Sequence, residues 1–265
     1  MIVTYGDWLK EWLRVYKKPY VKNYNTLKRN IELHIPQKIK KTKLNVITAF
    51  DIQSVLLSVK TSRVRVEIYD IYHGSLSMAY KNGLLYRDVA AALIKPKHTR
   101  KVGAALTRSE VSAFIDSIQK TRFKYYYTFC LLTGCRRSEA LSVRWSKIDY
   151  EKNRIHIHGT KTATSDRFIP IFPELKTLLE TIPRKDDKLF HHYPNRVTRD
   201  FKKYCSNHKL HDLRHTFATR CLECGVSIKV VQTWLGHARL YTTASIYIHL
   251  LPDFEKSESE KVKLF

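Results

Sequence analysis

The chain has 265 residues, of which 48 are Lys or Arg and 24 are Asp or Glu, so its formal net charge is +24 at pH 7. Its 12% aromatic and 43% hydrophobic content excludes an intrinsically disordered chain, and no apolar run reaches the roughly 20 residues that a membrane span needs. Residues 1–100 carry half of the excess positive charge and residues 101–265 the other half, which favours a polyanion that both parts of the chain contact.

The first hundred residues predict a small bundle of helices. Apolar side chains recur at helical spacing after the capping residue Thr4, over residues 24–31, after the capping residue Thr48 and over residues 62–81. Helices that follow one another at such short intervals pack as a bundle. The segment Lys38–Lys43 is rich in lysine and is predicted to be a basic loop.

A polar stretch without apolar periodicity follows, reading Lys-Pro-Lys-His-Thr-Arg-Lys over residues 95–101. A basic stretch that contains proline is typical of a linker between domains. We therefore expect a helical domain over residues 1–94, a basic linker over 95–104 and a second domain over 105–265 that ends in a charged tail.

The second domain is predicted to be mainly helical with one small β-hairpin. Thr107 and Glu110 form a capping box at its start. Helical periodicity recurs over residues 108–119, 122–132, 173–180 and 195–205. The pattern changes to period two over 154–158 and 167–171, which flank a polar turn that contains Lys161. The expected fold class is therefore mainly α with a small β-hairpin or sheet, an α+β arrangement in two domains.

Two charged residues near the middle of this domain indicate an anion site. Gly134 is expected to end one helix and Arg136 to begin the next, with Glu139 three residues later on the same face. An arginine at a helix start opposes the helix dipole, unless it faces an anion that the backbone N–H groups also favour. A surface arginine in a local pair with Glu139 is the alternative interpretation.

The last third of the chain predicts two further helices. The first has an apolar stripe formed by Leu210, Leu213, Phe217 and Cys221. Gly225 is expected to end this helix, and Ser227 to cap a second helix that ends at Gly236.

Polar groups lie at the ends and flanks of these helices. His211 and Arg214 are three residues apart and therefore neighbours on one helix flank. His237 follows the helix end at Gly236, and Tyr247 is expected on a last short helix. Two imidazoles, a guanidinium and a phenol in such positions suit a phosphate.

Five cysteines raise the question of a metal site: Cys130, Cys135, Cys205, Cys221 and Cys224. The last two form a single Cys-x-x-Cys, and His208, His211 and His215 are near in sequence, so zinc is one interpretation. No second Cys-x-x-Cys exists, and Cys221 belongs to the apolar stripe. Reduced cysteines that pack as small hydrophobic side chains are therefore the favoured interpretation, without metal or cofactor.

Five segments then carry a family resemblance. In chain order they are T-G-C-R-R-S-E-A-L, the G-T-K-T turn, H-D-L-R-H-T-F-A-T, L-G-H and T-T-A-S-I-Y-I-H-L. Their types and order resemble those of the tyrosine recombinases, also called phage integrases, and the N-terminal bundle resembles that family's SAM-like core-DNA-binding domain. The resemblance implies a catalytic set that comprises Arg136, Lys161, His211, Arg214, His237 and the nucleophile Tyr247, with Glu139 as a supporting acid.

The same resemblance implies a reaction without metal or nucleotide. Tyr247 would attack a DNA phosphodiester and form a covalent 3′-phosphotyrosine, while Arg136 and Arg214 clamp the phosphate. His211 would accept or share the proton of the nucleophile, and Lys161 would protonate the departing 5′ oxygen. His237 would donate a hydrogen bond to a non-bridging oxygen.

The implied partners are double-stranded DNA at core recombination sites and three further copies of the chain in a tetramer. The C-terminal tail would either dock in trans through Phe254, Leu264 and Phe265 or fray, and a directionality factor is a further candidate partner. No membrane is expected, and the location would be the nucleoid of a prokaryotic cytoplasm or a viral host. The first helix begins almost at Met1, which leaves no room in this sequence for the family's additional arm-binding domain and indicates either a recombinase that binds core sites only or a truncated form. Integration or excision of a mobile element or phage is the expected role.

Two other functions remain open at this stage. A type IB topoisomerase-like enzyme would nick and reseal one duplex with similar chemistry. A non-catalytic, basic DNA-binding protein would need the charge but not the complete set of polar side chains.

Overall fold

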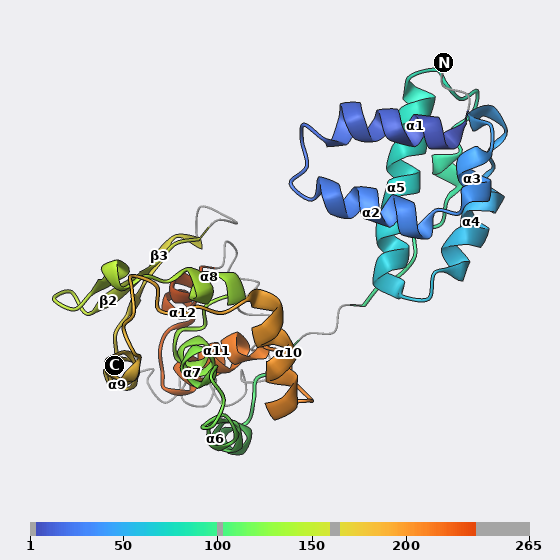
Figure 1. Cartoon of the computed structure of the whole chain (residues 1–265). Coiled ribbons are helices and arrows are strands. Elements are labelled where there is room, and N and C mark those ends of the chain that lie inside the picture. Colours follow the sequence, from blue (N-terminus) through green and yellow to red (C-terminus); the bar gives the residue numbers. More distant parts are fainter. Residues whose placement is uncertain (1–3, 100–102, 160–164, 237–265) are drawn as a thin grey trace, which may run out of the picture. The chain divides into compact units, whose positions relative to one another are not determined.

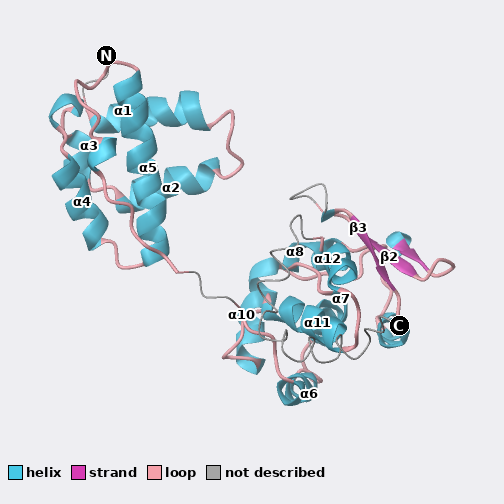
Figure 2. Cartoon of the chain, turned by 180° about the vertical axis from the view of Figure 1, so that it is seen from behind, coloured by secondary structure: helices cyan, strands magenta, loops and turns pink. Residues whose placement is uncertain are grey.

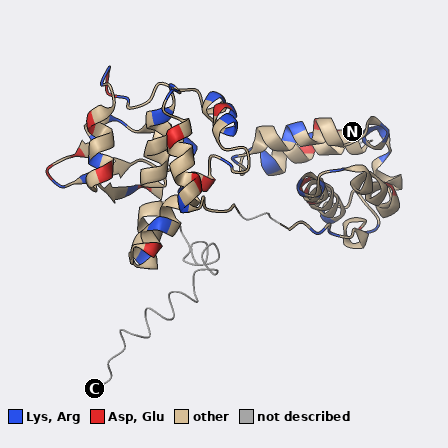
Figure 3. Ribbon diagram, turned by 90° about the horizontal axis from the view of Figure 1, so that it is seen from below, with Lys and Arg blue, Asp and Glu red and all other residues tan. Residues whose placement is uncertain are grey.

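The computed structural model describes residues 4–99, 103–159 and 165–236, and the chain divides into two compact units, Met1–Arg100 and Lys101–Phe265 (Figure 1). Both units are mainly helical, and the three named strands of the described residues all belong to the second (Figure 2). The predicted fold class, mainly α with a small antiparallel sheet, is confirmed. Lysine and arginine residues occur in both units (Figure 3).

The first unit is a bundle of helices and short helical turns. In chain order they are α1 (Tyr5–Trp12), a π-helical turn (Leu13–Lys17), α2 (Tyr24–His34), α3 (Gln37–Lys41), a 3-10 turn (Leu44–Val46), α4 (Ala49–Ser58), α5 (Ser62–Lys81) and a 3-10 turn (Ala90–Ala92). Thr4 and Thr48 cap α1 and α4, as predicted, and each forms a complete capping box with an aspartate three residues later.

The prediction of a basic loop over Lys38–Lys43 is wrong, because α3 occupies Gln37–Lys41. Pro36 precedes this helix, and Ile39 is buried in the core of the first unit. One apolar residue among lysines creates no visible periodicity, so only its burial against the other helices reveals the helix.

A buried polar contact joins α1 to α5 inside the first unit. The Tyr5 hydroxyl lies 2.7 Å from the Ser75 hydroxyl, and Trp8 Nε1 donates to the Ser75 carbonyl over 2.8 Å. The Tyr5 ring also stacks on Tyr72, with 5.7 Å between the ring centroids. The hydroxyl of Tyr5 and the indole N–H of Trp8 therefore each have a partner within the core, which offsets the cost of removing these groups from water.

The second unit combines helices with a three-stranded sheet. Its elements are α6 (Arg108–Ser117), α7 (Lys124–Thr133), α8 (Arg137–Ser142), a 3-10 turn (Trp145–Lys147), β1 (Ile148–Asp149), β2 (Arg154–Ile157), β3 (Arg167–Pro170), α9 (Pro173–Thr181), α10 (Pro194–Tyr204), α11 (Asp212–Glu223) and α12 (Ile228–Leu235). The strands are antiparallel in the order β1-β2-β3, and Ile155 lies opposite Ile169. The predicted hairpin therefore consists of β2 and β3, and β1 pairs with the other edge of β2 as a third strand.

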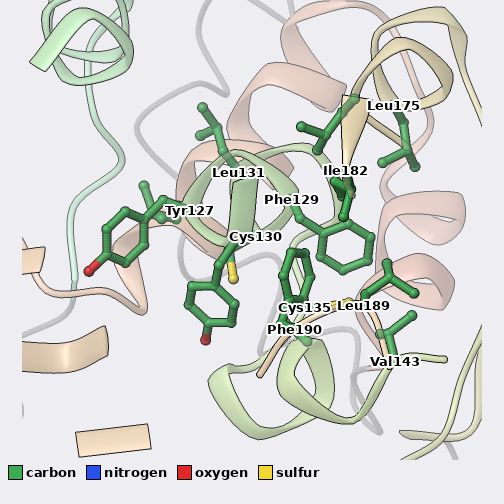
Figure 4. Close-up of a cluster of buried hydrophobic side chains, with 14 of the residues drawn as sticks. Tyr127, Phe129, Cys130, Leu131, Cys135, Val143, Leu175, Ile182, Leu189 and Phe190 are labelled. Carbon is green, nitrogen blue, oxygen red and sulfur yellow. The ribbon is translucent and has the colours of Figure 1, made fainter. Parts of the chain in front are cut away.

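Helix α7 lies at the centre of the second unit and packs against α8, α9 and α11. Its sequence is apolar on several sides, which suits a helix surrounded by other elements. Tyr127, Phe129 and Cys130 of α7 are buried, and Figure 4 shows them among side chains from α9 and the loop around Leu189 and Phe190. This core holds the helix ends on which the site is built.

The helix boundaries around the predicted site agree with most of the turn signals. The Thr107 hydroxyl accepts from the Glu110 N–H, Gly225 follows α11, and the Ser227 hydroxyl accepts from the Val230 N–H at the start of α12. The apolar stripe predicted from Leu210 begins too early, because α11 starts at Asp212 and His211 is its N-cap residue.

Candidate active site

Arg136 occupies the N-cap of α8, directly after the turn that ends α7. Gly134 makes this turn with a φ of +61°, and a Cβ there would lie 2.6 Å from the Phe217 ring and 2.8 Å from Leu235. Glycine is therefore required both for the left-handed backbone and for the close approach of α11 and α12. The turn delivers Arg136 to the point where these helices meet.

Glu139 binds Arg136 through both of its carboxylate oxygens. The Arg136 backbone N–H donates to Oε2 over 2.9 Å, and Nη1 donates to Oε1 over 2.6 Å. The carboxylate is buried, with 7% of the side chain exposed, whereas 26% of the Arg136 side chain is exposed. Glu139 therefore orients a guanidinium whose outer part still reaches solvent.

Arg214 lies in the first turn of α11 and is almost completely buried. Its Nη1 donates to the Gly134 carbonyl over 2.8 Å, and its Nη2 donates to the Leu235 carbonyl. Burial, and then the nearby charges of Arg136 and Arg167, lower the pKa of Arg214 to about 9. The side chain is therefore still charged at neutral pH, in a place where positive charge is already concentrated.

A third guanidinium, which the sequence did not identify as part of the site, comes from β3. Arg167 Nη2 donates to Glu139 Oε2 over 3.0 Å, Nη1 donates to the Ser165 carbonyl over 2.9 Å, and Nε donates to the Trp234 carbonyl. Only 3% of this side chain is exposed. A signal was present in the period-two pattern, because Arg167 falls on the same face as buried Ile169. A charged residue in a core position indicates a buried ion pair.

Glu139 is the anionic centre of this arginine cluster, which we define as Arg136, Arg167 and Arg214 around Glu139. Arg214 Nη1 lies 4.0 Å from Glu139 Oε2. Burial alone would raise the pKa of Glu139, but the charge of Arg167 and the hydrogen bonds from Arg136 and Arg167 outweigh it and hold the pKa below its ordinary value. Three positive charges and one negative charge leave an excess of two, which favours an additional anion.

The C-terminal end of α12 points into the same cluster. The carbonyls of Trp234, Leu235 and Gly236 accept hydrogen bonds from Arg167, Arg214 and Arg136, the last over 3.5 Å. These carbonyls have no partner within the helix and carry the negative end of its dipole. The three guanidinium groups therefore satisfy three successive carbonyls directly before His237.

His211 stands at the edge of the cluster, at the N-cap of α11. Its ring meets His215 edge to face, with 5.2 Å between the centroids. Desolvation, followed by the charges of His215, Arg214 and Arg136, lowers the pKa of His211 to about 4. Although the residue remains exposed, the two arginines act in the same direction as desolvation. The imidazole is therefore neutral at physiological pH and able to accept a proton.

A cavity of about 350 Å³ opens beside His211. Its walls include Arg137 of α8, Thr198 of α10 and Lys209 in the loop before α11. Arg137 Nη1 donates to the Thr198 hydroxyl over 2.9 Å. The cavity thus continues the positive character of the site outward from His211.

The structure brings together four of the seven predicted site residues. Arg136, Glu139 and Arg214 belong to one network, and His211 is electrostatically coupled to both arginines. Lys161, His237 and Tyr247 lie outside the described residues, as does the whole C-terminal tail.

The cysteines, a metal site and a membrane span were also considered in the sequence. Cys221 packs against the apolar cluster of α11 and α12, while Cys224 is exposed. Within the ranges that the structure describes, no three His, Cys, Asp or Glu side chains are grouped so that they could hold a metal ion. Over the same ranges, none of the helices combines the length and apolar character needed to cross a membrane.

Comparisons with known proteins identify the family. Residues 104–253 match the model of the phage integrase family, and residues 4–57 match the phage integrase N-terminal SAM-like domain. The tyrosine recombinase XerA of Thermococcus onnurineus is 33% identical over 200 residues, which cover 68% of this chain and 70% of that protein. XerA of Saccharolobus solfataricus is 34% identical over 188 residues, or 68% of this chain and 64% of that protein.

Solved structures show the same fold. The Tn1549 transposon integrase in complex with a circular intermediate DNA superposes with a TM-score of 0.74 at 17% identity, over 98% of this chain and 100% of that one. A lambda integrase dimer bound to a COC′ core site gives a TM-score of 0.78 at 19% identity, over 92% of this chain and 77% of that one. The chain belongs to the phage integrase family, and it is a tyrosine-type site-specific DNA recombinase.

Proposed function

We propose that the chain cleaves and rejoins DNA strands through a covalent 3′-phosphotyrosine on Tyr247, with the scissile phosphate bound by Arg136 and Arg214. The observation that carries this proposal is the excess positive charge of the arginine cluster, where three buried or half-buried guanidinium groups face a single carboxylate. Attack on a phosphodiester adds negative charge to the non-bridging oxygens, and fixed cationic donors stabilise that added charge.

The two clamp arginines retain donors for such an anion. Each guanidinium has five N–H groups, and each uses two of them on described partners. Up to three donors remain on each side chain, and their orientation is set by Glu139 and by the carbonyls of Gly134 and Leu235. Preorganisation of this kind is what makes electrostatic stabilisation effective, because no donor has to be reoriented during the reaction.

His211, Lys161 and His237 complete the proposed mechanism. His211 accepts the proton of the attacking phenol, and its lowered pKa keeps the imidazole in the neutral form that this step requires. Lys161 protonates the 5′ oxygen that leaves, and His237 donates to a non-bridging oxygen. The bond energy is conserved in the phosphotyrosine, so a second strand with a free 5′ hydroxyl reverses the step and reseals the backbone.

The proposed substrate is double-stranded DNA at core recombination sites, contacted by both units through their positive charge. Lambda integrase forms a tetramer bound to a Holliday junction, and we propose the same assembly for this chain, with the tail docking in trans and a directionality factor selecting the outcome. The biological role would be integration or excision of a mobile element or phage, at the nucleoid of a prokaryotic host.

Covalent trapping tests this proposal. The adduct is first captured from the native host under denaturing conditions, and the attached DNA is sequenced. A nicked suicide duplex with that sequence is then incubated with the parent protein, with Tyr247→Phe and with the matched control Tyr241→Phe. The parent and Tyr241→Phe should form an adduct that withstands denaturation, whereas Tyr247→Phe should bind DNA without forming it.

Other outcomes would identify the alternatives. Loss of the adduct in Tyr241→Phe but not in Tyr247→Phe would contradict the assigned nucleophile. Relaxation of a supercoiled plasmid without the captured sequence would favour a topoisomerase-like enzyme. DNA binding that is identical in all three proteins, with no adduct in any, would favour a non-catalytic DNA-binding protein.

A further inference from the structure

We propose that Arg167, on β3, is a positioning residue for strand cleavage, which fixes Glu139 and the end of α12 relative to the hairpin. This inference rests on the proposed function, since it concerns the same reaction. Arg167 contacts neither of the proposed clamp arginines through a hydrogen bond. Its effect on the reaction is transmitted through the groups that it holds.

Three of the hydrogen bonds of Arg167 join three separate segments. Nη2 reaches Glu139 of α8, Nη1 reaches the Ser165 carbonyl before β3, and Nε reaches the Trp234 carbonyl at the end of α12. The partners in α8 and α12 are 28 and 67 residues away in sequence. A planar guanidinium has donors in fixed directions, so it constrains all three partners at once.

Each of these segments leads directly to a proposed catalytic group. Glu139 orients Arg136, Ser165 follows the turn that contains Lys161, and Trp234 lies three residues before His237. A displacement of any of them changes the geometry of the phosphate site. Misplacement by about 1 Å can lower a reaction rate roughly 100-fold.

Burial explains why the position requires an arginine. The side chain is 3% exposed and pairs with the buried carboxylate of Glu139, so a neutral residue at this position would leave Glu139 with Arg136 and Arg214 as its remaining cations among the described residues. Lysine offers one compact donor group and cannot reach a carboxylate and two carbonyls in different directions. Arg167→Lys should therefore keep the charge but lose most of the constraint.

The charge of Arg167 also affects the pKa of Glu139, which gives a second and independent measurement of its role. The groups that face Glu139 are Arg136 from the start of α8, Arg167 from β3, Arg214 from α11 and the neighbouring Cys135 thiol. Among the single causes that lower the pKa of Glu139, the charge of Arg167 is the largest. Removal of this charge should raise the pKa of Glu139, so that protonation of Glu139 limits the reaction at a higher pH than in the parent.

The test compares the parent with Arg167→Met and Arg167→Lys, and with Arg154→Met as the matched control. Arg154 belongs to the adjacent strand β2 but pairs with Asp149 and lies over the Phe168 ring, away from Glu139. The probe is the nicked suicide duplex described above. The measurements are the Kd from fluorescence anisotropy and the rate of adduct formation at saturating DNA as a function of pH.

We expect Arg167→Met to keep the Kd while the cleavage rate falls about 100-fold, with the acid limb of the pH profile moved to higher pH. In Arg167→Lys the cleavage rate should fall about tenfold, and the acid limb of its pH profile should stay where it is in the parent. This variant also provides the rate comparison if Arg167→Met fails to fold. Arg154→Met should behave like the parent. Parental rates in both Arg167 variants, or a loss that follows only the folded fraction with an unmoved pH profile in Arg167→Met, would overturn the proposal.

If the parent itself forms no adduct, the proposed function fails and not the placement of Arg167. In that case the pH dependence of the free energy of unfolding tests the coupling of Arg167 to Glu139, since this measurement requires no DNA. The acid limb of stability should lie at higher pH in Arg167→Met than in Arg167→Lys, and coincident limbs would overturn the coupling to Glu139.

Discussion

Arg136 holds the two oxygens of the Glu139 carboxylate from two directions, with its backbone N–H 2.9 Å from Oε2 and its Nη1 2.6 Å from Oε1. The same carboxylate therefore caps the start of α8 and orients the guanidinium. Helix formation and the geometry of the proposed phosphate clamp are consequently coupled in one residue pair.

Arg136→Lys should lower the cleavage rate about 100-fold with little change in Kd. The backbone N–H still reaches Glu139, but a lysine cannot bind Oε1, the Gly236 carbonyl and a phosphate in fixed directions. Adduct formation on the suicide duplex under single-turnover conditions measures the effect. Arg108→Lys is the control, because Arg108 pairs with Glu223 on the surface. Parental cleavage by Arg136→Lys would contradict the assigned clamp.

Glu139→Gln should destabilise the second unit by about 3 kcal/mol, since it leaves buried guanidinium groups without their counter-charge. Equilibrium unfolding in urea, followed by the fluorescence of Trp145 and Trp234, measures the change. Glu223→Gln, which breaks surface pairs with Arg108 and Arg220, should cost at most about 1 kcal/mol. Equal effects of the two substitutions would show that the burial of Glu139 has no energetic weight.

The stability difference between the parent and Glu139→Gln should depend on pH. The pKa of Glu139 in the folded chain lies below its ordinary value of 4.5. Its contribution is therefore complete above the unfolded value and is lost as the pH falls through the lower folded value. Unfolding free energies measured from neutral to acidic pH should converge for the two proteins at the acidic end. A constant difference over the whole range would contradict the lowered pKa.

His211 should remain neutral well below the pH at which a free imidazole becomes charged. Its pKa is lowered from 6.5 to about 4, so the unfolded chain binds this proton first and the contribution of His211 to stability is lost as the pH falls between these values. An NMR titration of the labelled imidazole measures the pKa directly. Arg136→Met removes one of the charges that lower it and should shift it upward. A midpoint near 6.5 in the parent would contradict the lowered pKa of His211.

Ser75→Ala should destabilise the first unit by about 1–2 kcal/mol, because the buried Tyr5 hydroxyl loses its partner. Hydrogen exchange of the amides of α1 and α5 reports on this unit alone. Ser54→Ala on α4 is the control, since the Ser54 hydroxyl is exposed and donates to the Phe50 carbonyl within the same helix. Similar exchange in the two variants would mean that the buried contact adds nothing.

Local signals in the sequence determined most of the helices and four of the five described site residues, all except Arg167. Thr4, Thr48 and Thr107 begin helices through contacts three residues away, and Gly134 ends α7 through its own backbone angle. Arg136 and Glu139 are likewise three residues apart, so their proximity follows from helical geometry. The spacing of such groups can be read from the sequence alone, without knowledge of the tertiary packing.

Only the tertiary structure shows which distant residues complete the arginine cluster. Arg167 meets Trp234 across 67 residues and Arg136 meets Gly236 across 100, distances in sequence over which no periodicity carries information. The burial of Ile39 in α3 depends in the same way on neighbouring helices. Whether a charged side chain is solvated or buried is a property of its three-dimensional surroundings, because the free energy of the charge depends on which partners replace water.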